Sequence, residues 1–138
     1  MSRRDLYHDA VRNALEKDGW TITHDPLPLG DQELLVFADL GAEKLLAAQR
    51  GLQKIAVEVK VLGGVSTITE LQKAIGQYGL YRYLLERDEP ERRLYLAVPQ
   101  EIYSEYFSKE VIQGWLIREQ IQLLIFDPEL EVLQWLGM

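Results

Sequence analysis

The chain contains no cysteine, only two histidines and no long uninterrupted run of apolar residues. Without cysteine there are no disulfides and no thiolate metal sites, and two histidines are too few for a typical zinc site. A membrane-spanning helix needs roughly 20 apolar residues in a row, and the polar start MSRRDLYHDA lacks the apolar core of a signal peptide. We therefore expect a cytoplasmic protein that does not enter membranes.

Positive charge is also scarce. The chain has 15 lysines and arginines against 22 aspartates and glutamates, which gives a formal net charge of −7. General nucleic-acid binding depends on basic side chains that neutralise phosphates. The composition therefore argues against a nucleic-acid coat protein. Any action on DNA would need a local basic patch, a bound cation or a partner protein.

The pattern of apolar residues predicts one α/β (α+β) domain over residues 1–138, with a mixed sheet between helices. Helical spacing predicts helices over residues 5–18 and 67–86, and Ser108 is a candidate N-cap for a third helix. Residues 24–31, with two prolines and a glycine, are predicted to form a loop. Short apolar runs predict strands at residues 20–23, 34–40, 42–49, 55–60, 93–98, 121–127 and 131–136.

Residues 42–49 are also good helix formers, but a hairpin turning at Arg50 and Gly51 is favoured. Such a hairpin would lay residues 34–49 beside the next strand, IAVEVK, which covers residues 55–60. The third helix and the last two strands then form a C-terminal addition to the mixed sheet.

The IAVEVK strand carries two charges on one face. Side chains alternate along a strand, so Glu58 and Lys60 project together while the neighbouring valines face the other side. Charged side chains are rarely buried unless they are paired or bound to a metal. A solvated strand face, common in antiparallel sheets, is the alternative explanation.

A third charged residue, Asp39, closes the preceding apolar run. If the two strands pair, two carboxylates and an ammonium converge. Carboxylate oxygens suit Mg²⁺ or Mn²⁺, and such an ion polarises a phosphodiester and activates water. The residues thus favour phosphodiester hydrolysis, with Lys60 orienting the water or stabilising the developing charge. The alternatives are that Asp39 caps a turn and that Glu58 and Lys60 form a simple ion pair.

The following helix adds Gln77 and Tyr81, one turn apart in QYGLY. This order of residues resembles the PD-(D/E)XK nuclease superfamily, in particular its RecB-like branch. The order is an acidic residue, then E-x-K in an apolar strand, then Q-x-x-x-Y in a helix. The resemblance implies metal ligands at Asp39 and Glu58, a catalytic lysine at Lys60, and supporting or DNA-contacting roles for Gln77 and Tyr81. A packed or hydrogen-bonded pair on one helix face explains the last two residues almost as well.

Longer strings narrow the resemblance. The chain is similar to the cyanobacterial XisH family, the fdxN element excision-controlling factors. The stretches that carry this similarity are YHDAVRNALEKDGWTITHDPL, DLGAEKLLAAQ, KIAVEVK, IGQYGLYR, LYLAVP and FDPE. This resemblance implies a restriction-endonuclease-like fold and a role in developmentally regulated excision of a DNA element, together with a small companion protein, XisI, and a separate recombinase. One departure is Ala38, where the superfamily has proline before its first aspartate.

Two functions follow from these observations. One is a metal-dependent DNA endonuclease that uses Asp39, Glu58 and Lys60, and the other is a non-catalytic accessory factor that regulates recombination through its partner. Asp9, on the first helix, is a further candidate for the site, with His8 beside it, although a solvated helix face explains both. An exposed apolar surface is expected in the C-terminal third, covered by the companion or by a second copy, and is assigned to Trp115, Leu116, Trp135 and Leu136.

Overall fold

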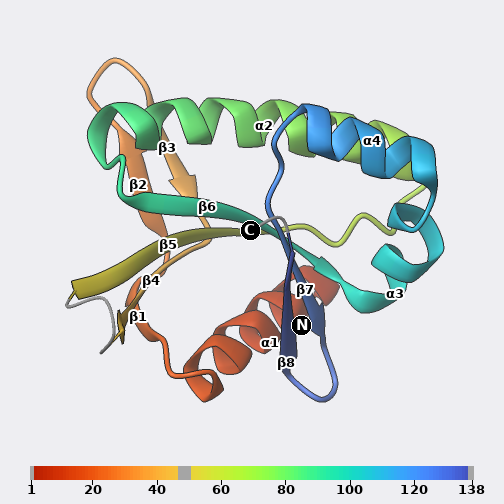
Figure 1. Cartoon of the computed structure of the whole chain (residues 1–138), viewed down its shortest axis with the longest axis horizontal. Coiled ribbons are helices and arrows are strands. Elements are labelled where there is room, and N and C mark those ends of the chain that lie inside the picture. The colour runs from red at the N-terminus through yellow and green to blue at the C-terminus, as the bar shows by residue number, and fades with distance from the viewer. Residues whose placement is uncertain (1, 47–50, 137–138) are drawn as a thin grey trace.

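A mixed six-stranded sheet lies between two helical layers in the computed structural model, which describes residues 2–46 and 51–136 (Figure 1). The strand order is β1-β4-β5-β6-β7-β8, with parallel pairing from β5 through β7 and antiparallel pairing elsewhere; β2 and β3 form a separate antiparallel hairpin. The strands are β1 (Thr21–His24), β2 (Leu27–Gly30), β3 (Leu35–Ala38), β4 (Leu40–Leu46), β5 (Gly51–Val59), β6 (Arg92–Pro99), β7 (Leu123–Asp127) and β8 (Val132–Leu136).

The helices cover opposite faces of this sheet. The longest, α2, lies with α4 on one face, and α1 lies on the other (Figure 1). None of the helices in the described ranges combines the length and apolar character that a membrane crossing requires. The helices are α1 (Arg3–Lys17), α2 (Thr67–Asp88), α3 (Gln100–Ile102), the π-helical turn η2 (Tyr103–Phe107) and α4 (Glu110–Arg118).

Strand β5 runs through the middle of the sheet, and its second half is buried on both faces. Its last five residues are all buried, and they alternate between two hydrophobic cores. Ala56 packs in the core beneath α2, whereas Ile55, Val57 and Val59 pack in the core beside α1. Strand alternation therefore places Glu58 on the α2 face, within the protein. The alternative of a solvated strand face is wrong for β5.

The predicted mixed sheet flanked by helices, with an added C-terminal helix and strands, is confirmed. The predicted hairpin is also confirmed, because β4 pairs with β5 from Leu40↔Val57 to Leu46↔Gly51. The turn predicted at Arg50 lies outside the described residues.

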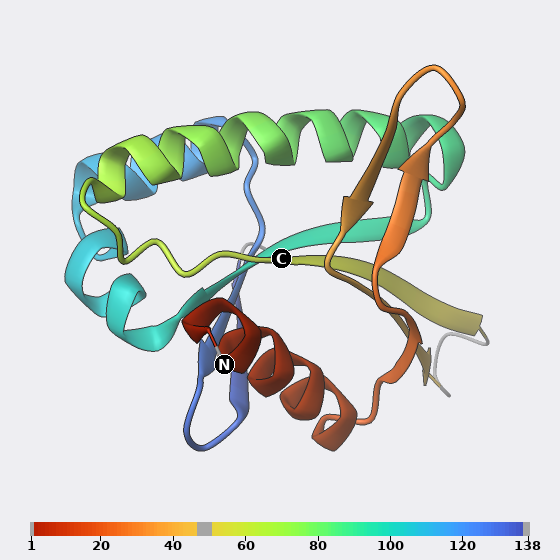
Figure 2. The same cartoon turned by 180° about the vertical axis from the view of Figure 1, so that it is seen from behind.

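Two loop and strand predictions around residue 30 are wrong. Residues 24–31 are not a simple loop, because they contain β2, which pairs with β3. Pro28 is tolerated there because a two-stranded sheet leaves free edges that need no N–H donor. The run 34–40 is not one strand, because it is interrupted at Asp39 and contributes to two different sheets. The hairpin that results stands beside α2 (Figure 2).

Ser108 is not the N-cap of α4. The cap position belongs to Lys109, without a side-chain hydrogen bond, and the Ser108 hydroxyl donates instead to the Ser104 carbonyl (2.7 Å). The π-helical turn η2 runs up to this point, so Ser108 satisfies the end of one helical segment rather than the start of the next.

The four residues predicted to form an apolar surface in the C-terminal third are buried or half-buried. Leu116 is 5% exposed, and the other three predicted residues pack against the two cores. Trp135 lies against the rings of Trp20 and Tyr95, with centroids 5.7 and 4.9 Å away. The large apolar side chains that do face solvent in this part of the chain are Val111, Ile117, Leu130 and Val132.

The packing of the core beneath α2 predicts how substitutions there affect the free energy of unfolding. Leu96 on β6 is fully buried in the core beneath α2, so we expect Leu96→Ala to lower the free energy of unfolding by about 2–5 kcal/mol. Leu130, 68% exposed, is the matched control, and its replacement by alanine should change stability by no more than about 0.5 kcal/mol. Urea denaturation followed by circular dichroism measures both, and equal effects would contradict this packing.

Candidate active site

The β4–β5 register brings Asp39 and Glu58 together. Leu40 on β4 pairs with Val57 on β5, and one further step along both strands sets Asp39 opposite Glu58. Side chains at opposed positions of an antiparallel pair lie on the same face of the sheet. The interruption at Asp39, which ends β3 and precedes β4, therefore places its carboxylate beside a buried glutamate.

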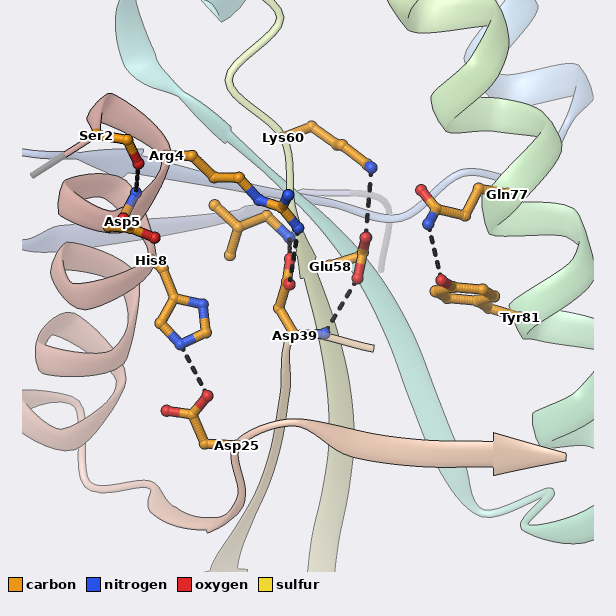
Figure 3. A network of polar contacts seen from close by, with 11 residues as sticks. Ser2, Arg4, Asp5, His8, Asp25, Asp39, Glu58, Lys60, Gln77 and Tyr81 are labelled. Carbon is orange, nitrogen blue, oxygen red and sulfur yellow. Dashed lines mark hydrogen bonds and ion pairs between the residues drawn. The ribbon is translucent and has the colours of Figure 1, made fainter. Parts of the chain in front are cut away.

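Each carboxylate is held by the backbone of the other strand. The Asp39 N–H donates to Glu58 Oε1 (3.1 Å), and the Val59 N–H donates to Asp39 Oδ2 (2.7 Å) (Figure 3). Such charge-assisted bonds fix the orientation of both side chains. One oxygen of each carboxylate is thereby committed to the fold, and Asp39 Oδ1 and Glu58 Oε2 face the two neighbouring cations.

Two cations lie next to these oxygens. Lys60 Nζ is 3.4 Å from Glu58 Oε2, and Arg4 Nη2, from α1, is 3.9 Å from Asp39 Oδ1 (Figure 3). The side chain of Lys60 is 28% exposed, whereas that of Arg4 is 73% exposed. The lysine is therefore an integral part of the half-buried site, and the arginine reaches it from the solvent side.

The environment of Glu58 favours its neutral form. Burial, followed by repulsion from the Asp39 carboxylate, raises the pKa of Glu58 to about 7, although Lys60 and the Asp39 N–H act in the opposite direction. A cation placed between the carboxylates would offset the same repulsion that now favours a proton. A carboxyl group that titrates near neutral pH beside a charge partner is also a recurrent property of functional sites.

Gln77 and Tyr81 border this site from α2. Gln77 Nε2 donates to the Tyr81 hydroxyl (2.7 Å), and both side chains point toward the Glu58 side of the sheet (Figure 3). Burial raises the pKa of Tyr81, and the negative charges of Glu58 and Asp39 add to this effect. The helical pair thus lies within the electrostatic field of the two carboxylates.

The first helix contributes a residue that the sequence did not single out. Asp9 is exposed, and the His8 ring is hydrogen-bonded to Asp25 (2.9 Å), whereas Arg4 reaches Asp39. Arg4, His8 and Arg12 recur at every fourth position, which puts them on one helix face. This spacing was the available signal, but only the packing of α1 against the sheet shows where the face points.

The donor set fits a hard divalent cation. Two carboxylates, each with one oxygen that faces a cation rather than the backbone, match Mg²⁺ or Mn²⁺, which keep several waters and take further oxygens from a phosphate. The described part of the chain contains no cluster of three or more His, Cys, Asp or Glu side chains arranged to enclose a metal. The site therefore suits an ion that shares its coordination with water and substrate.

The raised pKa of Glu58 predicts a pH-dependent effect on stability. The folded-state pKa of about 7 lies above the ordinary value of 4.5, so the contribution of Glu58 is fully present below pH 4.5 and is lost as pH rises through 7. Glu58→Gln should therefore exceed wild type in free energy of unfolding by about 1–3 kcal/mol at pH 8, and by much less at pH 5.

Denaturation at a series of pH values measures this difference. Glu129→Gln, at an exposed position in the β7–β8 turn, is the control and should follow wild type throughout. A Glu58→Gln advantage that did not grow between pH 5 and pH 8 would contradict a carboxyl group held near neutrality.

Known proteins resemble this chain over nearly its whole length. The XisH protein family model matches residues 1–134. The crystal structure of an XisH family protein from Nostoc punctiforme PCC 73102 is 41% identical, with a TM-score of 0.83 and coverage of 96% of this chain and 99% of that chain. The crystal structure of an fdxN element excision controlling factor protein from Anabaena variabilis is also 41% identical, with a TM-score of 0.86 and coverage of 96% and 98%. None of the curated proteins compared with the chain matches it significantly. The chain belongs to the XisH family.

Proposed function

We propose that this protein is a metal-dependent, endonuclease-like factor that acts on DNA during programmed excision of a DNA element. The observation that carries the proposal is the pair formed by the half-buried Asp39 and the buried Glu58, which is cross-bonded through the backbone and flanked by Lys60. The related protein from Anabaena variabilis, an fdxN element excision controlling factor, supplies the biological setting. The proposed partners of this protein are DNA and a small companion protein resembling XisI. The chain could also associate with a second copy of itself.

In this proposal Asp39 and Glu58 would hold one Mg²⁺ or Mn²⁺. When bound, the ion polarises the scissile phosphodiester and lowers the pKa of a water. Lys60 places an ammonium beside the same edge, where it orients the attacking water and stabilises the charge that develops on the phosphate. The Gln77–Tyr81 pair, joined by its own hydrogen bond, positions the backbone of the bound strand from the α2 side.

A second function, that of a non-catalytic accessory factor, is favoured by a different observation. The chain is acidic overall, with a net charge of −7, and each site carboxylate already has a cation beside it. A fold with this arrangement can persist as a partner-binding scaffold without a metal. The two functions differ in whether a divalent ion binds between Asp39 and Glu58.

Titration with Mn²⁺ tests the metal site. We expect one ion per chain, with an affinity that falls as the pH drops below about 7 because a proton then competes for Glu58. Glu58→Ala and Asp39→Asn should weaken binding by more than about tenfold, while Glu129→Ala, an exposed acid elsewhere, should leave it unchanged. Calorimetry gives stoichiometry and affinity together, and equal binding by all four proteins would rule out this site.

Cleavage tests the role of Lys60. Loss of one such electrostatic contact slows a reaction by about 10²-fold or more, so Lys60→Ala should cut supercoiled plasmid or branched DNA at least that much more slowly in Mn²⁺. Its folding and metal binding should be largely intact, and Lys73→Ala, an exposed lysine of α2, is the matched control.

The cleavage assay is run with and without the companion protein. Equal cutting by wild type and Lys60→Ala would indicate a contaminating nuclease. No cutting by wild type under any condition would favour the accessory-factor function instead.

A further inference from the structure

Two arginines at the start of α1 have the same charge and different surroundings. The guanidinium of Arg3 lies over the Tyr7 ring, 5.6 Å from its centroid, and close to Gly63, where an added Cβ would come within 2.7 Å of Arg3 Nη2. The guanidinium of Arg4 points to the Asp39 carboxylate (Figure 3). Neighbours in sequence are thus directed to different parts of the surface.

The contact of Arg4 with Asp39 is weak. A separation of 3.9 Å between Nη2 and Oδ1 is too long for a hydrogen bond, and the arginine side chain remains 73% exposed. Exposed ion pairs of this kind contribute little to stability. Arg4 is therefore placed at the site without being fixed in it, unlike the two carboxylates, which the backbone holds.

We propose that Arg4 binds the DNA backbone from the α1 side of this site, and that it pairs with Asp39 until a divalent cation binds Asp39 in its place. This rests on the proposed function. The two oxygens of Asp39 have different partners. Asp39 Oδ2 already accepts from the Val59 N–H, so a metal and Arg4 compete for the same oxygen, Oδ1.

Once a cation binds Asp39, the guanidinium is left beside a second positive charge and is available to another anion. A phosphate is the matching group, because its oxygens accept two parallel hydrogen bonds from the guanidinium fork. Figure 3 shows Arg4 entering from α1, with the Gln77–Tyr81 pair on the opposite side of the carboxylates. Arg4 would therefore contact a phosphate on the α1 side of the scissile bond.

The test compares Arg4→Gln with Arg3→Gln, which removes the same charge one residue away. Calorimetry measures Mn²⁺ affinity, and fluorescence anisotropy measures binding of a labelled duplex in Ca²⁺ over a series of salt concentrations. For Arg4→Gln we expect Mn²⁺ affinity equal to wild type or up to a few-fold higher, because a competing cation is gone. DNA affinity should fall about tenfold, and the salt slope should shrink by about one. Arg3→Gln should change both affinities by less than about twofold.

The outcomes separate this inference from the proposed function. If wild type cuts DNA and Arg4→Gln matches Arg3→Gln in every measurement, Arg4 has no such role although the nuclease stands. Weaker Mn²⁺ binding by Arg4→Gln, or no DNA binding by wild type, also overturns the inference. If wild type cuts nothing, yet divalent ions strengthen its DNA binding only while Arg4 is present, the inference holds and the accessory-factor function is favoured over the nuclease.

Discussion

The site depends on two backbone hydrogen bonds that cross between neighbouring strands. The Asp39 N–H binds Glu58 and the Val59 N–H binds Asp39, so two like-charged carboxylates are held side by side by the same strand pairing that builds the sheet. Carboxylates at directly opposed strand positions repel each other. The backbone donors, together with Lys60 and Arg4, offset that repulsion. A slip of β4 by one residue against β5 would move Asp39 to the other face, away from Glu58, and remove the site.

The sheet determines what this pair can do. Because the second half of β5 is buried on both faces between parallel β6 and antiparallel β4, Glu58 is withdrawn from water, and its pKa is raised to about 7. Asp39 lies where the chain passes from the β2–β3 hairpin into the sheet, so it remains closer to the surface. A buried acid and a more accessible acid thus lie side by side, with α1 on one side and α2 on the other (Figure 3). Repulsion between the two ionised carboxylates is the physical reason why this pair attracts a cation.

Local patterns in the sequence predicted most of this arrangement. Strand alternation was enough to put Glu58 and Lys60 on one face, and helical spacing was enough to pair Gln77 with Tyr81. Other features were decided by contacts between distant segments. The β2–β3 hairpin was missed because two prolines and a glycine are typical of loops, and the free edges of a two-stranded sheet make Pro28 acceptable. Arg4 was missed because nothing near it in sequence shows that α1 packs with this residue over Asp39.

The central claim is that Asp39 and Glu58 together bind one divalent cation. Anomalous diffraction from crystals soaked in Mn²⁺ tests it directly, because manganese scatters anomalously and can be located without reference to activity. We expect one strong peak within coordination distance of the Asp39 and Glu58 carboxylates, with the Arg4 guanidinium turned away from Asp39. Crystals with full access to Mn²⁺ that show no peak there, with Arg4 and Lys60 still beside the carboxylates, would contradict it.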